Sequence, residues 1–335
     1  MRVVSVYPNF ANQGGAQDVA LQLAEHLNKG VKPIVLVETP LSDIVPAYSS
    51  RAEFLPFSWH NVCKLADGNT LFLSHHRKNT SLLLLFGGMM CKKLPLIHVA
   101  HNTFTSLKWL SYFPETIIAV SNAVKANLIE YFGVPENRVQ VVFNGMKDVR
   151  NDKVSELHSQ EIHILLPGRI CPIKQQVDMV KALRGKLTNH IHIFFAGTGE
   201  DVETLKKEIE GNAQFHYVGF LKMDEHLNEY DYVCLFSKNE GLPLSLIEGC
   251  MFGKPLITNG IQAVLDINKP GQTGFSYPDF EALVDGLNKL PFPDSGYYKQ
   301  LSSQARKHYE TFFTEEKMIE RYKRIIQEEM NRFTK

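Results

Sequence analysis

The chain has 335 residues, enough for two domains of ordinary size, and 44% of them are hydrophobic, as in a water-soluble globular protein. Its 36 basic side chains balance its 36 acidic ones, which argues against a dedicated nucleic-acid binder because such proteins usually carry a basic excess. Residues 1–157 carry 15 basic and 12 acidic side chains, and residues 158–335 carry 21 and 24. This mild asymmetry permits, but does not require, contact between the N-terminal part and an anionic membrane surface.

Targeting segments and disulfides are not indicated. The apolar run at the N-terminus is too short for a signal peptide, and polar residues follow it at once. The longest apolar run, residues 82–90, is interpreted as a core helix ending near Lys92 and Lys93, because a membrane span needs about 20 residues. The 5 cysteines form no CxxC pair. They are interpreted as reduced core residues, which predicts a cytoplasmic protein.

Short apolar runs alternate with amphipathic stretches along the whole chain. The first run covers residues 3–7, and a stretch with helical spacing follows it and is closed by Gly30. The later runs cover residues 33–38, 71–74, 95–101, 116–121, 139–145, 162–168, 190–197, 215–219, 231–237 and 254–259. Continuous apolar strands that alternate with helices predict parallel sheets covered on both faces.

A polar stretch near residues 147–161 interrupts this pattern, after which it begins again. We therefore predict an α/β protein with one Rossmann-like domain over residues 1–157 and a second over residues 158–313. The final segment, 314–335, has apolar residues at helical spacing and is predicted to be a helix that packs back toward the N-terminal domain. In such folds ligands bind at the carboxyl ends of the strands, so the two parallel sheets are expected to face a central cleft.

The stretch NEGLPLSLIEG, residues 239–249, places two glutamates eight residues apart after a strand-like run. Pro243 suits the first position of a helix, and the leading amides of Leu244 and Ser245 would then form an anion site. Carboxylates bind hydroxyls well, so Glu240 and Glu248 suggest a ligand with phosphate in the middle and hydroxyls on both sides, as in a nucleotide sugar. An ordinary loop glutamate and a helix-surface glutamate would give the same spacing.

Two cations leave the carboxyl end of another predicted strand in PGRICPIK, residues 167–174. Arg169 and Lys174 would fit a diphosphate and could neutralise a departing one, although two solvated loop cations remain the alternative. Gly14 and Gly15 open the first predicted helix, which allows close backbone approach to a ligand. Neither this segment nor GTGED, residues 197–201, has the GxGxxG spacing of the dinucleotide fingerprint.

Taken together, these segments resemble the retaining glycosyltransferases of family 4, which have the GT-B fold. EGLPLSLIE is similar to the EX7E signature of that family, and GRICPIK has its Arg-to-Lys spacing. NQGGAQDVALQLAEHL, AVSNAVKANLIEYFGVPENRVQVVFNGM, GKPLITN and GQTGFSY resemble its other segments in the same order, from about residue 3 to residue 330. One departure is Gln175, which stands where the family usually has glycine after the lysine.

The resemblance implies a role for each matching residue. Arg169 and Lys174 would bind the donor diphosphate, Glu248 the ribose hydroxyls and Glu240 the transferred sugar. His101 matches the histidine that approaches the donor sugar, with His98 as the rival. The pair His75 and His76 could also face the cleft, but a non-catalytic role is favoured for it. The implied catalytic residues are Glu240, His101, Arg169 and Lys174. The implied donor-binding residues are Gly15, Gly168, Arg169, Lys174, Val218, Phe220, Glu240, Gly241, Leu242, Pro243, Leu244, Ser245 and Glu248.

The resemblance also implies the reaction. A hexose-type sugar would pass, with retention, from a nucleotide-diphosphate sugar to a glycan or lipid-linked acceptor during assembly of cell-surface polysaccharide or lipopolysaccharide. A UDP-sugar is favoured over a GDP-sugar. No DxD occurs in the chain, so neither a metal nor another cofactor is expected. Another GT-B nucleotide-sugar enzyme, such as an epimerase, and a non-catalytic GT-B partner subunit are the alternatives. The pairs Arg77–Lys78 and Lys92–Lys93 could lie against a membrane.

Overall fold

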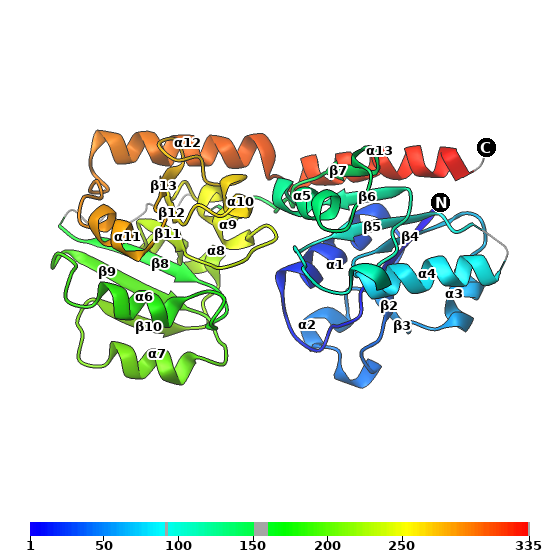
Figure 1. Ribbon diagram of the computed structural model, residues 1–335, viewed down its shortest axis with the longest axis horizontal. Coiled ribbons are helices and arrows are strands. Elements are labelled where there is room, and N and C mark those ends of the chain that lie inside the picture. Colours follow the sequence, from blue (N-terminus) through cyan, green and yellow to red (C-terminus); the bar gives the residue numbers. More distant parts are fainter. Residues whose placement is uncertain (91–92, 151–159, 334–335) are drawn as a thin grey trace. The chain divides into compact units, whose positions relative to one another are not determined.

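The computed structural model describes residues 1–90, 93–150 and 160–333, which form two compact units (Figure 1). Unit 1 contains Met1–Gly145 together with Glu315–Lys335, and unit 2 contains Met146–Thr314. The expected domain boundary between residues 157 and 158 lies outside the described residues, as do Cys91 and Lys92. Each unit is a parallel α/β sheet with helices, so the predicted fold class is confirmed.

Unit 1 has a seven-stranded parallel sheet in the order β3-β2-β1-β4-β5-β6-β7. Its strands are β1 (Arg2–Val6), β2 (Ile34–Val37), β3 (Glu53–Pro56), β4 (Thr70–Ser74), β5 (Leu96–Ala100), β6 (Thr116–Ala119) and β7 (Val139–Val141). Its helices are α1 (Gly15–Leu27), α2 (Pro46–Ser49), α3 (Trp59–Leu65), α4 (Arg77–Met89), α5 (Asn122–Glu130) and α13 (Glu315–Phe333), with the short 3₁₀ turns η1 (Leu41–Asp43), η2 (Lys108–Leu110) and η3 (Glu136–Arg138). The last helix, α13, buries an apolar stripe and packs on α1 and β5.

Unit 2 has a six-stranded parallel sheet in the order β10-β9-β8-β11-β12-β13. Its strands are β8 (Ile162–Pro167), β9 (Ile191–Ala196), β10 (Phe215–Gly219), β11 (Tyr232–Leu235), β12 (Leu256–Thr258) and β13 (Gly274–Ser276). Its helices are α6 (Gln176–Leu183), α7 (Val202–Ile209), α8 (Met223–His226), α9 (Leu244–Met251), α10 (Gln262–Leu265), α11 (Phe280–Leu287) and α12 (Gly296–Phe312), with the 3₁₀ turn η4 (Leu227–Glu229).

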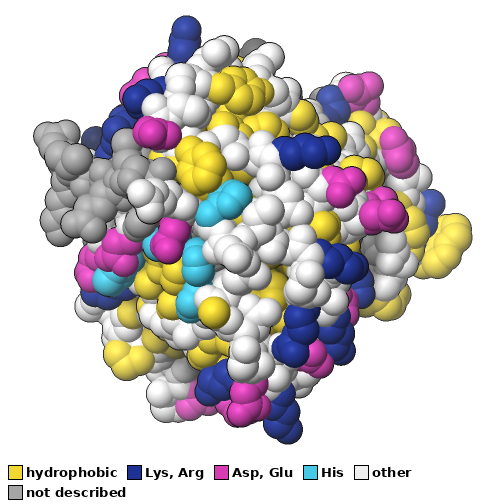
Figure 2. Space-filling model, turned by 90° about the vertical axis from the view of Figure 1, so that its left-hand side faces the viewer, with side chains coloured by type: hydrophobic (Ala, Val, Ile, Leu, Met, Phe, Trp, Pro, Cys, Tyr) yellow, Lys and Arg dark blue, Asp and Glu magenta, His cyan; other side chains and the backbone are white. Residues whose placement is uncertain are grey.

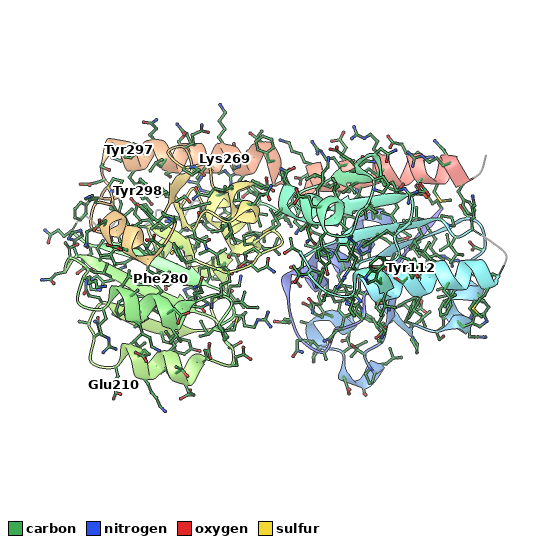
Figure 3. All side chains as sticks on the ribbon, viewed as in Figure 1. Tyr112, Glu210, Lys269, Phe280, Tyr297 and Tyr298 are labelled. Carbon is green, nitrogen blue, oxygen red and sulfur yellow. The ribbon has the colours of Figure 1, made fainter. Side chains whose placement is uncertain are left out.

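Helix α9 is held unusually close to the sheet of unit 2. A Cβ added at Gly249 would lie 2.9 Å from a methyl group of Leu256 and 3.1 Å from one of Val233, so a larger residue would require these side chains to shift. Farther along the unit, Tyr298, labelled in Figure 3, donates its hydroxyl to the carbonyl of Asp231 at 2.7 Å. These contacts fix α9 and α12 against β11, and thereby fix where the first turn of α9 lies.

The predicted strands all form, and two strands that the sequence did not predict join them. These are β3 and β13, which lie at the outer edges of the two sheets. In Figure 2, basic and acidic side chains are interspersed over the visible face, in keeping with the zero formal net charge. No helix among the described residues is long and apolar enough to cross a membrane.

Candidate functional site

The loops that leave β8 and β11 carry the predicted donor-site residues of unit 2. Because β8 and β11 are parallel neighbours, both loops begin at the same edge of the sheet. There the Nζ atom of Lys174 donates to the Oε1 atom of Glu240 at 2.5 Å. The side chains are 19% and 10% exposed, respectively, so the pair is largely withdrawn from solvent. Two residues assigned from separate motifs therefore meet in one ion pair. Arg169, from the same loop as Lys174, is exposed.

A buried glutamine that the sequence did not single out holds the loop after β8. The Nε2 atom of Gln176 donates to the carbonyl of Arg169 at 3.0 Å, and its Oε1 atom accepts from the amide of Cys171 at 3.4 Å. On the other side, the hydroxyl of Ser237 and the amide of Lys238 both donate to the carbonyl of Ile173. The backbone that carries the two cations is thus tied both to α6 and to the loop after β11.

The GTG sequence after β9 serves close packing. A Cβ added at Gly197 would lie 1.9 Å from the carbonyl oxygen of Gly168, and one added at Gly199 would lie 2.1 Å from that of Ile170. The amide of Ile170 donates to the carbonyl of Thr198 at 2.9 Å. These glycines therefore let the loop after β9 support the loop that carries Arg169 and Lys174.

Gln175 has a left-handed backbone conformation, with φ 55° and ψ 25°, and directly precedes α6. This region favours glycine, because a Cβ crowds the backbone there. The observation gives a physical reason for the glycine that the family usually has at this position. In this chain Gln175 adopts the left-handed backbone conformation although it carries a side chain.

The first turn of α9 differs slightly from the prediction. Pro243 was expected at the first helical position, but it is the N-cap, with extended backbone at φ −73° and ψ 111°, and Leu244 begins the helix. The prediction was wrong by one residue because proline has no amide to donate and fits either position. The amides of Leu244 and Ser245 still lead the helix, where amides lack intrahelical acceptors. Glu248 is half-buried in its second turn, and Gly241 and Leu242 are buried before it.

The remaining residues predicted in unit 2 lie at the end of β10. Val218 and Phe220 flank Gly219, and Phe220 is 69% exposed. An aromatic side chain that gains so little from burial in the core is available to stack on a planar ligand. Within residues 1–90, 93–150 and 160–333, no three His, Cys, Asp or Glu side chains are grouped so that they could hold a metal ion.

In unit 1, Gly15 begins α1. Three histidines belong to the neighbouring strands β4 and β5: His75 follows β4, His98 is the central residue of β5, and His101 follows β5. The Nδ1 atom of His75 lies 2.9 Å from the Nε2 atom of His101. His98 is buried, and its Nδ1 atom lies 2.8 Å from the hydroxyl of Thr80. Burial lowers the pKa of His101 to about 4 and that of His98 to about 3. Of the two rival histidines, only His101 is partly exposed.

Comparisons with known proteins show which families and folds the chain resembles. The family model described as Glycosyltransferase Family 4 matches residues 13–150, and the model described as Glycosyl transferases group 1 matches residues 148–308. The O-antigen biosynthesis glycosyltransferase WbnH of Escherichia coli is 26% identical over 160 residues, which are 48% of this chain and 46% of WbnH. The chain thus spans about half the length of the curated relatives first matched. The uncharacterized glycosyltransferase MJ1607 of Methanocaldococcus jannaschii is 23% identical over 310 residues, covering 86% of this chain and 75% of that one.

Solved structures share the whole fold at low sequence identity. Anabaena Alr3699/HepE in complex with UDP has a TM-score of 0.86 at 15% identity, covering 98% of this chain and 100% of that one. The lipopolysaccharide outer core galactosyltransferase WaaB, in its apo form, has a TM-score of 0.74 at 15% identity, covering 98% and 99%. From the two family models, which together span residues 13–308, and from this shared fold, the chain belongs to the family 4 glycosyltransferases of the GT-B fold.

Proposed function

We propose that the chain is a retaining, metal-independent glycosyltransferase that moves a hexose-type sugar from a nucleotide-diphosphate sugar to a glycan or lipid-linked acceptor. The ion pair between Lys174 and Glu240 is the observation that carries this proposal. Arg169 belongs to the same loop as Lys174, and α9 begins at Leu244, shortly after Glu240. In this proposal the cations and the helix amides would bind phosphate, and the carboxylate would bind sugar hydroxyls. WbnH is an O-antigen biosynthesis glycosyltransferase and WaaB a lipopolysaccharide outer core galactosyltransferase, which supports a role of this chain in O-antigen or lipopolysaccharide assembly.

The chemistry follows from these groups. The bond between C1 of the sugar and the diphosphate oxygen breaks, while Lys174, Arg169 and the amides of Leu244 and Ser245 stabilise the charge that develops on the diphosphate. The acceptor oxygen bonds to C1 on the same face, and its proton passes to the departing phosphate oxygen. Glu240 orients the sugar, which brings the reacting atoms into position. No metal is needed for charge neutralisation in this scheme.

The donor is proposed to be a UDP-sugar, with a GDP-sugar as the second choice, because structural neighbours at 15% identity were solved with UDP and with UDP-glucose. A thermal-shift screen against UDP-, GDP-, ADP- and TDP-sugars tests this, since a ligand at 100 times its Kd stabilises by about 2.7 kcal/mol. The UDP series should raise Tm most. Stabilisation by another nucleotide alone would overturn the choice of donor.

Transfer itself is tested by product analysis with the stabilising donor and a panel of glycan and lipid-linked acceptors, with and without chelator. The α-anomer of the donor should give an α-linked product, and chelator should leave turnover unchanged. Conversion of the donor without acceptor would indicate an epimerase-like enzyme. Donor binding with no transfer to any acceptor would indicate a non-catalytic subunit.

A surface of unit 1 is proposed to contact an anionic membrane, where a lipid-linked acceptor would be found. Leu107, Trp109, Leu110 and Tyr112 are all at least 63% exposed, and Trp109 is 87% exposed. Tyr112 lies beside α4 in Figure 3, and its amide donates to the hydroxyl of Ser81 at 3.0 Å. Exposed tryptophan and tyrosine favour the membrane–water interface because their rings are apolar and carry a polar group.

The same part of unit 1 supplies charge and space for a lipid. Lys78, Lys93 and Lys108 lie on or near α4 and this loop, and Lys78 also pairs with Glu38. A groove of about 520 Å³ opens between α4 and α13, lined mainly by apolar side chains that include Leu84 and Phe113. The groove would take the lipid part of an acceptor, while the lysines meet anionic headgroups.

The two tryptophans of the chain allow a clean test of this contact. In the Trp59→Phe variant, Trp109 is the only tryptophan, and its fluorescence should shift to shorter wavelength with vesicles that contain an anionic phospholipid. The Trp109→Phe variant, which keeps only Trp59, should shift less and serves as the matched control. Equal spectra with and without vesicles in the Trp59→Phe variant would refute the contact.

A further inference from the structure

We infer that His75 is a positioning residue, which fixes the ring orientation and the tautomer of His101. The inference deepens the proposed function, since it rests on His101 acting in sugar transfer. His75 follows β4 and His101 follows β5, and these strands are neighbours in the sheet of unit 1. Their ring nitrogens, Nδ1 and Nε2, are 2.9 Å apart, and the stacked rings have centroids 5.2 Å apart.

Each of the two neutral rings carries one proton, and one of these two protons forms the hydrogen bond between the rings. Burial lowers the pKa of His75 and of His101 below the ordinary value for histidine, so neither ring is charged near neutral pH. A hydrogen bond between two neutral imidazoles needs one ring to donate and the other to accept. Either His75 donates from Nδ1, or His101 donates from Nε2.

The surroundings of His75 favour the first arrangement. Its Nε2 atom is buried and has no hydrogen-bond partner among the described residues. If His101 donated, His75 would carry its own proton on Nε2, as a buried N–H group without an acceptor. An unsatisfied buried polar group costs about 1–3 kcal/mol, and orphaned N–H groups are rarer than under-satisfied acceptors. His75 therefore donates from Nδ1 and leaves Nε2 as a bare acceptor.

The consequence lies in what His101 can offer a ligand. Its Nε2 atom accepts from His75, so its single proton resides on Nδ1. His101 then meets a sugar as a hydrogen-bond donor to a hydroxyl oxygen, and it has no free basic nitrogen to take a proton. This agrees with a transfer in which the departing phosphate receives the acceptor proton.

A small cavity beside the pair defines the competing arrangement. It has a volume of about 50 Å³ and is lined by His75, His76, Arg77, His98 and His101, among others. Such a space holds a few water molecules. A water that accepts a hydrogen bond from Nε2 of His75 would satisfy the opposite tautomer. The experiment must therefore observe the proton itself.

Long-range ¹H–¹⁵N correlation spectra of the full chain labelled with ¹⁵N-histidine distinguish the two tautomers of each neutral ring. The signals are assigned by their loss in the His75→Asn and His101→Asn variants. The inference requires a proton on Nδ1 in both rings. A proton on Nε2 of His101 would overturn it. Because this readout needs neither donor nor acceptor, it stands even if the proposed transfer reaction fails.

Substitutions at His75 then test the consequence for turnover. The amide nitrogen of His75→Asn lies near the position of Nδ1 and can replace the donor, whereas His75→Gln places the same amide one methylene farther out. Loss of orientation at a reacting site can lower turnover about 100-fold. We expect His75→Ala and His75→Gln to lose about 10- to 100-fold in kcat with little change in KM for the donor, and His75→Asn to recover most of kcat. Equal kcat in His75→Ala and the unchanged chain would overturn the positioning role.

Discussion

The ion pair between Lys174 and Glu240 gives the sharpest test of the donor site. We consider Lys174→Met and Glu240→Gln, singly and combined. The two side chains are 2.5 Å apart and at most 19% exposed. Each single change leaves one charge largely out of water without its partner. The combined change leaves no charge, so the three variants separate the cost of an isolated charge from the cost of losing the pair.

The magnitude follows from this burial. Removing one partner of a fully buried pair costs about 3–5 kcal/mol, and the residual exposure here lowers the expected cost to about 2 kcal/mol for each single variant. The double variant should be less destabilised than the sum of the two, by about 2 kcal/mol. For transfer, each single variant should lose at least about 100-fold in turnover, or about 2.7 kcal/mol of transition-state stabilisation.

Tryptophan fluorescence cannot report on this site, because Trp59 and Trp109 both belong to unit 1. Unfolding of unit 2 is better followed in urea by hydrogen exchange of peptides from residues 160–180. Lys206→Met is the matched control, because Lys206 pairs with Glu203 at 2.8 Å on the surface of α7. An exposed pair contributes little to stability because water and salt screen it.

The reasoning is refuted if Lys174→Met destabilises unit 2 no more than Lys206→Met does. It is also refuted if the two single effects simply add in the double variant. Near-normal transfer by Lys174→Met or Glu240→Gln would remove the catalytic roles given to these residues, whatever the stability data show.

Three further outcomes are expected. Gln175→Gly should stabilise unit 2 by about 0.5–1 kcal/mol. Glycine relieves about 1–2 kcal/mol of strain in the left-handed backbone conformation, and this gain exceeds the cost of the conformational entropy that glycine adds to the unfolded chain. Urea midpoints measure the change. Gly197→Ala should destabilise by about 3 kcal/mol or more in the same assay, since its Cβ would meet the carbonyl of Gly168, whereas Gly296→Ala, which meets nothing within 4 Å, should not. Burial lowers the pKa of His98, so on acidification this side chain is protonated in the unfolded chain at a higher pH than in the folded chain. The free energy of unfolding therefore falls as the pH drops below 6.5. Between about pH 7 and 5.5 this loss should reach about 1.3 kcal/mol for this group, and tryptophan fluorescence should show a smaller pH effect in His98→Leu.

The sequence was sufficient to predict the central strands of both sheets and the edge strands β7 and β10, but not the edge strands β3 and β13. Continuous apolar runs such as 162–167 are buried on both faces, and this pattern is typical of central parallel strands. Strand β3 has exposed residues at both ends, and β13 has only three residues. Neither has an apolar run that could distinguish it from a loop, because an edge strand needs less burial.

The proposed donor site could be predicted where charge and spacing carry information, but not where contacts depend on the fold. Arg169, Lys174 and Glu240 have side chains whose chemistry suggests a ligand. Gln176 and His75 act on their neighbours, and their partners come from adjacent loops or strands. No local pattern marks a buried glutamine that holds a loop, or a histidine whose partner is 26 residues away.

The pairing of Lys174 with Glu240 also sharpens what the eight-residue spacing of the two glutamates means. An ammonium group has three N–H donors, and one contact with Glu240 leaves two for phosphate oxygens. The carboxylate likewise keeps its Oε2 atom for a sugar hydroxyl, since Oε1 accepts from Lys174. The pair can therefore persist when a donor binds, and it would hold the phosphate contact and the sugar contact at a fixed separation. Such preorganisation acts most strongly where water is largely excluded, as it is around these two side chains.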